Sequence, residues 1–356
     1  MYTRVTARHL AATLVLLAAP VAAGQSFAVA SAASPPPPTG AAAPPAAACG
    51  AGRTLRVHFY DVAQGLAALV DLPDGRHVLV DTGDRAHRAG CGDVCETSER
   101  HLLERLRADL GGAPIDVLWI THPHSDHIGA AADVLDAFPV GLYIDNGRDA
   151  HKAEVARAHR AARAHGVAIE VVDPAHAAWP AGHSLDTPGA ALTPVVPPSW
   201  PSSCAHDANE CSIALRVDFC ASSVLLTGDA EHAEEAALEG LGPVTLLQVA
   251  HHGSATSTTP GFLAKTRPKY AVISVGRPGE GLNAEYCLPR ALIVQRLTRV
   301  LGGAGIKTLQ AFDGERCDAA RPSDWISVPT SDRLWATERD GDVVLTTRGD
   351  GTFERQ

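Results

Sequence analysis

The residues best suited to chemistry lie in one short segment, where three histidines and one aspartate occur within six positions: His122, His124, Asp126 and His127. Packing alone does not explain so many imidazoles in one place. The apolar, β-branched run 115–120 just before them predicts a buried strand, so the four side chains should follow its end. Side chains two positions apart point to one side of a strand, whereas Asp126 and His127 should begin a helix over 127–137. Two displaced pairs of ligands fit two metal ions better than one.

This segment resembles the metal-binding motif of the metallo-β-lactamase superfamily, in which the first two histidines hold one zinc ion and the following Asp and His hold the second. The likeness extends, in the order of the branch related to the competence protein ComEC, to five further segments: 55–65, 78–84, 224–231, 249–254 and 268–276. It runs from about Leu55 to Val275 and resumes at Trp335. Phosphorylcholine esterases of the superfamily share the plan. The resemblance implies an α/β fold, a four-layer αββα metallo-β-lactamase-like sandwich.

The resemblance also implies the remaining ligands. Asp229, after the apolar run 224–226, is placed like the carboxylate that bridges the two ions. His251 or His252 should give the first ion its third histidine, and we prefer His251. Asp126 has two open roles, as a ligand of the second ion and in orienting the attacking water. The cofactor would be two Zn²⁺ ions, with Mn²⁺ as an alternative, and the shared water would become a hydroxide near neutral pH because the ions lower its pKa.

One departure concerns the last ligand of the second ion. Where relatives commonly carry Gly-His-Pro after the strand that ends at Val275, this chain has Cys287-Leu288-Pro289, and leucine cannot bind a metal. Three explanations are open. Cys287 binds as a thiolate, or the second site lacks one ligand, or the segment 313–333, which looks like an insertion, delivers another group.

A second departure is Leu66, which stands where the branch usually has an acid. Loss of this acid would change either the hydrogen bonds that support the ligands or a contact with the substrate. Asp81 is retained. It should either hold the ligand loops in place by hydrogen bonds or cap the turn at Thr82-Gly83.

The N-terminal region predicts export. Residues 1–33 combine two early arginines, an apolar run and Ala-x-Ala steps, as in a secretory signal peptide; the rival interpretation, a membrane anchor, needs about 20 apolar residues, and the run is shorter. The Pro/Ala-rich stretch 34–48 predicts an extended linker. One hydrolase domain should follow over 49–356, since a chain of this size can bury one large core. We therefore expect a secreted protein with no transmembrane segment after cleavage.

All eight cysteines follow the predicted signal, and an even number in an oxidising compartment favours disulfides. Local spacing predicts Cys91–Cys95 and Cys204–Cys211, followed by Cys287–Cys317. Cys49–Cys220 is then left by elimination. For Cys220 the alternative is a buried free thiol that packs as a small hydrophobe.

The formal net charge of −10 argues against a broad surface for polyanions, because a protein that follows a nucleic-acid backbone usually has a basic stripe. The arginines here are scattered among acids, as in 100–109. The expected partner is a small-molecule or polymeric ester substrate, and recognition of phosphate would come mainly from the metals.

The pattern of apolar residues predicts two sets of strands, with helices between and after them. The first set lies at 54–60, 66–72, 77–82, 115–121 and 141–145, with helices at 96–110, 127–137 and 151–166. The second set lies at 191–196, 211–219, 222–228, 244–250 and 270–275, with helices at 231–240 and 289–301. A last hairpin is expected from 334–337 and 343–346 around the turn Asp340-Gly341.

The leading hypothesis is a secreted, zinc-dependent hydrolase that acts through a metal-bound hydroxide on a phosphodiester or related ester. One alternative is a lactone or amide hydrolase of the lactamase kind. Another is a metal-stabilised binding module without turnover, in which Leu288 has replaced a ligand.

Overall fold

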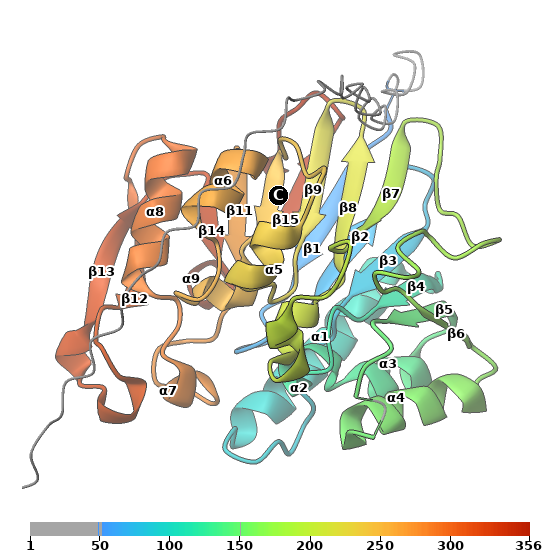
Figure 1. Cartoon of the computed structure of the whole chain (residues 1–356), viewed down its shortest axis with the longest axis horizontal. Helices are drawn as coiled ribbons and strands as arrows, with labels where there is room; N and C mark the ends of the chain where they lie inside the picture. Colours follow the sequence, from blue (N-terminus) through green and yellow to red (C-terminus); the bar gives the residue numbers. More distant parts are fainter. Residues whose placement is uncertain (1–48, 50–51, 150) are drawn as a thin grey trace, which may run out of the picture. The chain divides into compact units, whose positions relative to one another are not determined.

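The computed structural model describes residue 49 and residues 52–149 and 151–356 (Figure 1). The predicted signal peptide (1–33) and linker (34–48) lie outside the described residues. No helix in the described part is long and apolar enough to cross a membrane.

Two large sheets carry the fold. The first has eight strands in the order β16-β15-β1-β2-β3-β4-β5-β6, and its strands β3 to β6 run parallel. Its bounds are β1 Leu55–Phe59, β2 Ala68–Asp71, β3 His77–Val80, β4 Ile115–Trp119, β5 Val140–Asp145, β6 Ala168–Val171, β15 Val343–Thr347 and β16 Glu354–Arg355.

The second sheet has six strands in the order β14-β11-β10-β9-β8-β7, of which β9, β10, β11 and β14 run parallel. Its bounds are β7 Ala190–Val195, β8 Ala214–Phe219, β9 Ser222–Leu226, β10 Leu246–Gln248, β11 Tyr270–Ile273 and β14 Leu334–Ala336. A separate antiparallel pair consists of β12 Lys307–Phe312, which precedes the expected insertion 313–333, and β13 Trp325–Thr330, which lies within it.

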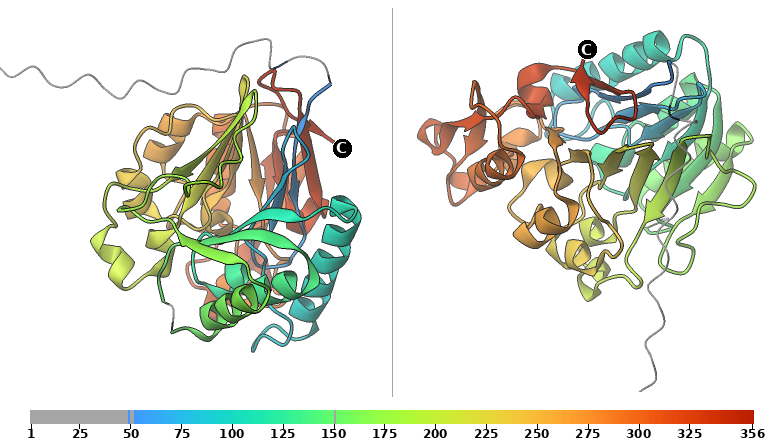
Figure 2. Two further views of the ribbon diagram at one scale, coloured as in Figure 1. Left: turned by 90° about the vertical axis from the view of Figure 1, so that its right-hand side faces the viewer. Right: turned by 90° about the horizontal axis from the view of Figure 1, so that it is seen from above.

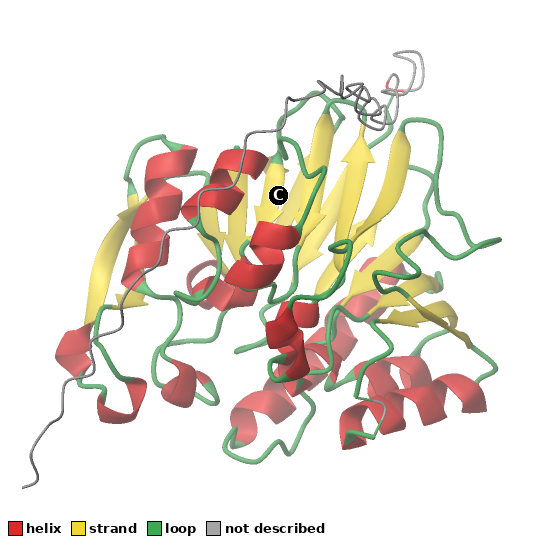
Figure 3. Cartoon of the chain, in the orientation of Figure 1, coloured by secondary structure: helices red, strands yellow, loops and turns green. Residues whose placement is uncertain are grey.

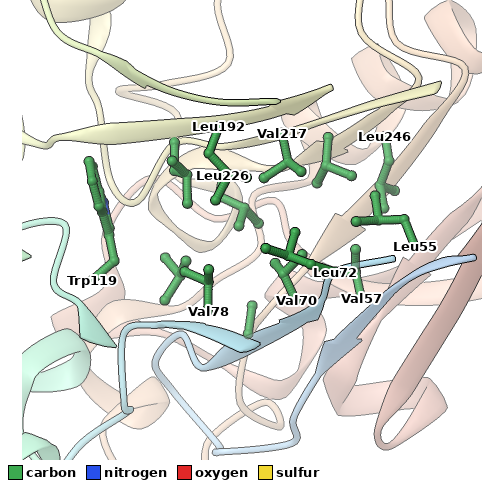
Figure 4. Close-up of a cluster of buried hydrophobic side chains, with 14 of the residues drawn as sticks. Leu55, Val57, Val70, Leu72, Val78, Trp119, Leu192, Val217, Leu226 and Leu246 are labelled. Carbon is green, nitrogen blue, oxygen red and sulfur yellow. The ribbon is translucent and has the colours of Figure 1, made fainter. Parts of the chain in front are cut away.

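The two sheets pack face to face. Figure 4 shows the side chains between them, with Val57, Val70 and Val78 on one side and Val217 and Leu226 on the other. These residues are buried, and the alternate side chains of the same strands point outward to the helices. The central strands are therefore apolar on both faces, which explains their continuous hydrophobic sequence.

Helices cover both outer faces, as Figure 3 and the view from above in Figure 2 show. Against the eight-stranded sheet lie α1 Asp93–Leu110, α3 Ala131–Ala137 and α4 Ala153–Ala164. Against the six-stranded sheet lie α6 Pro260–Thr266 and α8 Ala291–Leu301. The shorter helices are α2 Ser125–Ile128, α5 His232–Ala237, α7 Asn283–Tyr286 and α9 Thr337–Asp340. The predicted αββα sandwich is confirmed.

The predicted last hairpin is wrong. β14 pairs in parallel with β11 in the six-stranded sheet, whereas β15 pairs antiparallel with β1 in the eight-stranded sheet. The segment between them is helix α9, and the expected turn residue Gly341 ends that helix. Asp340-Gly341 therefore marks a crossing from one sheet to the other.

All four predicted disulfides are present: Cys49–Cys220, Cys91–Cys95, Cys204–Cys211 and Cys287–Cys317. Cys220 is therefore not a free thiol. Four disulfides are consistent with an oxidising compartment.

Candidate metal centre

The predicted ligands lie where parallel strands of both sheets end. The loop after β4 carries His122 and His124, and the short helix α2 that follows carries Asp126 and His127, as expected. The segments after β9 and β10 carry Asp229 and the pair His251-His252. Ligand sites of open α/β sheets commonly form outside the carboxyl ends of the strands. The centre therefore spans the line along which the two sheets meet.

Four donors form one close group, in which the candidate ligand atoms all lie within 4.8 Å of one another: Asp126, His127, Asp229 and His252. Asp229 Oδ2 lies 3.1 Å from His127 Nε2 and 3.4 Å from His252 Nε2. His252 Nε2 is 3.3 Å from both Asp126 Oδ2 and His127 Nε2. Donors at 2.0–2.2 Å from a tetrahedral ion are about 3.3–3.6 Å apart. Three of the distances above are close to this spacing, whereas His127 Nε2 and Asp126 Oδ2 are 4.0 Å apart, so the group is a candidate site for one divalent cation.

The other predicted donors lie beside this group. His122 Nε2 and His124 Nδ1 are 3.1 Å apart, and the ring of His122 lies 4.2 Å from that of His127, centroid to centroid. His251 Nε2 is 4.0 Å from Asp229 Oδ2. Asp229 Oδ1 is buried and has no hydrogen-bond partner among the described residues. A buried carboxylate oxygen without a partner is costly, and a second cation next to the two histidines would satisfy it.

The structure thus brings all seven predicted ligands together and separates the two adjacent histidines. His252 belongs to the group around Asp126 and His127, whereas His251 lies outside that group, with its Nε2 4.0 Å from Asp229 Oδ2. Which ion each residue binds, including our preference for His251 at the first ion, stays a prediction.

The structure bears on the explanations offered for Leu288 at 287–289. Cys287 is bonded to Cys317, so it cannot bind as a thiolate. Within the described residues, none of 313–333 lines the cavity at the centre. His252 joins Asp126, His127 and Asp229 in a group of four donors that needs no group at position 288. Whether a second site lacks one ligand stays a prediction. Leu288 lies buried in the cavity wall.

Asp81 holds the ligand loop in place by hydrogen bonds, which is the first of the two roles expected for it. Its carboxylate lies 2.7 Å from His127 Nδ1 and accepts hydrogen bonds from the backbone N–H and the hydroxyl of Thr121, both at 2.8 Å. The N–H groups of Thr82 and Gly83 instead donate to backbone carbonyls. Leu66, at the other departure, packs between the sheets, and its N–H donates to the carbonyl of Asp126.

Three further supports were not predicted. Glu231 Oε1 lies 2.8 Å from His251 Nδ1, the carbonyl of Ser274 accepts from His252 Nδ1 at 2.7 Å, and Thr121 Oγ1 lies 3.1 Å from His122 Nδ1. Each contact fixes one ring nitrogen and leaves Nε2 for the centre, which is the arrangement usual for metal-bound histidines. Only Glu231 had a sequence signal, its place two residues after Asp229.

The charges of the donors divide into two kinds. Burial, together with the neighbouring imidazole of His127, lowers the pKa of His122 and His124, so these two rings stay neutral. Burial also opposes protonation of His252, but the Asp229 and Asp126 carboxylates outweigh it and raise its pKa to about 10. Asp229 and Asp81 raise the pKa of His127 in the same way. A divalent cation would replace the protons that balance these carboxylates.

A cavity of about 340 Å³ opens onto the centre. Its walls include two cations, Arg88 and Lys152, and the neutral residues Asn209, Tyr286 and Leu288. Arg88 is held 3.7 Å from Asp84. Burial and the Asp126 carboxylate raise the pKa of Asp84 to about 6. Of these wall residues only Leu288 stood out in the sequence, as the departure from the expected ligand pattern.

Comparison with known proteins agrees with this site. Residues 60–277 match the family model of the metallo-beta-lactamase superfamily. The chain belongs to this superfamily. Its members are metal-dependent hydrolases, and the cluster around Asp229 is a candidate divalent-metal site.

Two curated relatives carry the same resemblance. Recombination protein 2 of Haemophilus influenzae is 32% identical over 228 residues, which cover 63% of this chain and 24% of the relative. ComE operon protein 3 of Bacillus subtilis is 30% identical over 258 residues, which cover 68% of this chain and 30% of the relative. The chain therefore spans about a quarter to a third of the length of these relatives. The predicted likeness to the ComEC-related branch is confirmed.

Similar solved structures include CmlA, a diiron beta-hydroxylase from Streptomyces venezuelae, with 15% identity, a TM-score of 0.39 and coverage of 64% of this chain and 46% of that chain. A diphosphatase from the PhnP family has 17% identity, a TM-score of 0.35 and coverage of 62% of this chain and 85% of that chain.

Proposed function

We propose that this protein is an exported phosphodiesterase that depends on two divalent metal ions, Zn²⁺ or alternatively Mn²⁺. The observation that carries the proposal is the convergence of six donor residues around Asp229. One Asp229 oxygen faces His127 and His252, and the other is buried without a hydrogen-bond partner among the described residues. His122, His124 and His251 would hold one ion. Asp126, His127 and His252 would hold the other, with Asp229 between them.

Bound divalent ions would supply a water of lowered pKa and positive charge for the transferring group. The chain itself would supply orientation. Asp81, Glu231 and Ser274 keep three imidazoles aimed at the centre. Arg88 and Lys152 line the same cavity, and in a chain of net charge −10 these two cations favour an anionic substrate at this place.

The cations are also the reason to prefer a phosphodiester to a lactone or an amide. A phosphodiester carries a negative charge that guanidinium and ammonium groups recognise through charge-assisted hydrogen bonds, whereas a carbonyl substrate has no such charge. The name of the Haemophilus relative, Recombination protein 2, supports DNA as the source of the phosphodiester substrate. The four disulfides support export to an oxidising compartment.

The test offers the purified protein bis(p-nitrophenyl) phosphate, a cephalosporin and a lactone, each with Zn²⁺ or Mn²⁺. We expect turnover of the phosphodiester, which Asp229→Asn abolishes together with part of the bound metal. The matched control is Asp218→Asn, a half-buried strand carboxylate that pairs with Arg216 instead of the donor cluster. Activity confined to the cephalosporin or lactone would refute the phosphodiesterase proposal, and one tight ion without turnover of any ester would identify a binding module.

A further inference from the structure

A second, smaller cavity adjoins the one at the metal centre. It measures about 170 Å³ and shares two wall residues, His124 and Lys152, with the larger cavity. Its remaining walls come from the loop after β5 and from the loop 202–211. Because β5 is the parallel neighbour of β4, which carries the histidine motif, the two cavities follow one another along the carboxyl edge of the same sheet.

Arg148 is the cation that distinguishes this smaller cavity. Its backbone N–H donates to Asn146 Oδ1 at 3.1 Å, and its guanidinium donates to the carbonyl of Cys204 at 3.4 Å. Both partners are well fixed, since Asn146 is buried at the end of β5 and Cys204 is closed into a loop by its disulfide with Cys211. Within the described residues Arg148 forms no ion pair, so most of its donors stay available.

The two carboxylates of the same walls already have partners. Asp149 pairs with Lys152 at 2.9 Å, and Asp207 accepts a hydrogen bond from the backbone N–H of Asn209 at 3.0 Å. The exposed imidazole of His206 is a further donor in the wall. Among the described residues Arg148 is thus the wall cation that pairs with no carboxylate, and the flat fork of donors on its guanidinium matches a phosphate.

We propose that this smaller cavity binds a second phosphate of the substrate, next to the ester at the metal centre, with Arg148 as the residue that recognises it. The inference rests on the proposed phosphodiesterase function and narrows it. The preferred substrate carries at least two neighbouring phosphates, as an oligonucleotide does, and a substrate with a single phosphoester leaves the cavity empty. Lys152, which faces both cavities, contacts either phosphate.

The experiment compares the dinucleotide thymidylyl-thymidine with the same molecule bearing a terminal phosphate, at the 5′ end in one series and the 3′ end in the other. For the unsubstituted protein we expect one of the phosphorylated forms to have a kcat/KM about tenfold higher than the plain dinucleotide, mainly through KM. Arg148→Ala should bring that ratio close to one. Arg148→Lys, which keeps a cation but loses the fork, should retain part of it.

The matched control is Arg163→Ala, an exposed arginine eleven positions beyond Lys152 on α4, about 16 Å along the helix. It removes the same charge and should leave the ratio unchanged. Equal kcat/KM for all dinucleotides in the unsubstituted protein, or equal losses in Arg148→Ala and Arg163→Ala, would overturn the inference.

Calorimetric binding of the same dinucleotides separates this inference from the proposed function. If no dinucleotide is cleaved but a terminal phosphate tightens binding in an Arg148-dependent manner, the phosphodiesterase proposal fails and the second-phosphate cavity stands. If the dinucleotides are cleaved without any preference, the phosphodiesterase proposal stands and the cavity inference fails.

Discussion

The donor cluster and the wall of the cavity differ in how they are built. The donors follow the ends of buried strands, and buried partners such as Asp81 and Ser274 hold them. The wall residues come from irregular segments, and three of these segments are closed by disulfides. Arg88 precedes Cys91, Asn209 lies between Cys204 and Cys211, and Tyr286 and Leu288 flank Cys287. The core therefore fixes the chemistry, whereas cross-linked loops determine what can enter.

The largest effect should come from the centre of the cluster. Asp229→Asn keeps the shape of the side chain but removes the charge that faces His127 and His252. We expect the proposed phosphodiesterase activity to fall on the order of 10³-fold or more, because the carboxylate proposed to lie between the two ions is lost. Elemental analysis should also show fewer ions per chain. Full activity with an unchanged metal content would contradict the bridging role.

The next effect concerns a residue that touches no ion. Asp81→Asn leaves the donors in place but weakens the contact that aligns His127 and the Thr121 loop. A change of this kind typically lowers metal affinity about 10–100-fold. Competition with a chromophoric chelator measures the affinity. The control is Asp116→Asn, whose carboxylate accepts from the His77 backbone away from the centre; equal losses in both variants would argue against a specific role for Asp81.

The cluster should also respond to pH in a way that the wall does not. In the metal-free protein His252, with a pKa of about 10, and His127, with a raised pKa, hold protons at neutral pH. A cation must displace them, so Zn²⁺ affinity should rise with pH by about tenfold per unit for each proton released. Affinity that is flat between pH 6 and pH 9 would contradict this coupling.

The same pKa shifts predict the stability of the metal-free protein. A raised histidine pKa stabilises the folded state fully below the unfolded value of 6.5, and this stabilisation is lost as the pH rises through about 10. Denaturant unfolding should therefore show that the metal-free protein loses stability from pH 7 to pH 10, while the metal-loaded protein, which no longer holds these protons, loses less. An equal loss in both forms would show that other groups dominate.

The smallest effect should come from the wall. Removing the disulfide next to Leu288 with the pair Cys287→Ala and Cys317→Ala should raise KM about threefold to tenfold, because the wall loses its fixed position, and should leave the metal content unchanged. Removing Cys49–Cys220, which closes no cavity segment, is the matched control. A loss of metal in the Cys287/Cys317 variant would contradict the claim that the disulfide-closed loops shape the cavity wall without holding the metal donors.

The sequence predicted the cluster well because its residues are short-range motifs at the ends of apolar strands. The donors at 122–127, the carboxylate at 229 and the support from Asp81 all follow from such local patterns. The roles of the two adjacent histidines could not be distinguished from the sequence, because a long-range contact orients them. The Ser274 carbonyl accepts a hydrogen bond from His252 Nδ1, and His252 Nε2 thereby faces Asp126. The disulfides were predictable because two of them close short local loops.

Other features depend on long-range contacts that no local pattern encodes. Asp340-Gly341 has the chemistry of a hairpin turn, yet pairing with β11 and β1 sends its two flanking strands to different sheets. Strand β6 was missed because it lies at a sheet edge and is mostly exposed, so it lacks an apolar pattern. Arg88, Arg148 and Asn209 reach the cavities only through the folded course of their loops.

The most direct test of the account is a crystal structure of the zinc-loaded protein, with anomalous scattering recorded at the zinc edge. We expect two peaks on either side of the Asp229 carboxylate, one next to His122 and His124 and the other next to His127 and His252. A single peak, or a pair of peaks to which Asp229 contributes no ligand, would contradict the shared centre.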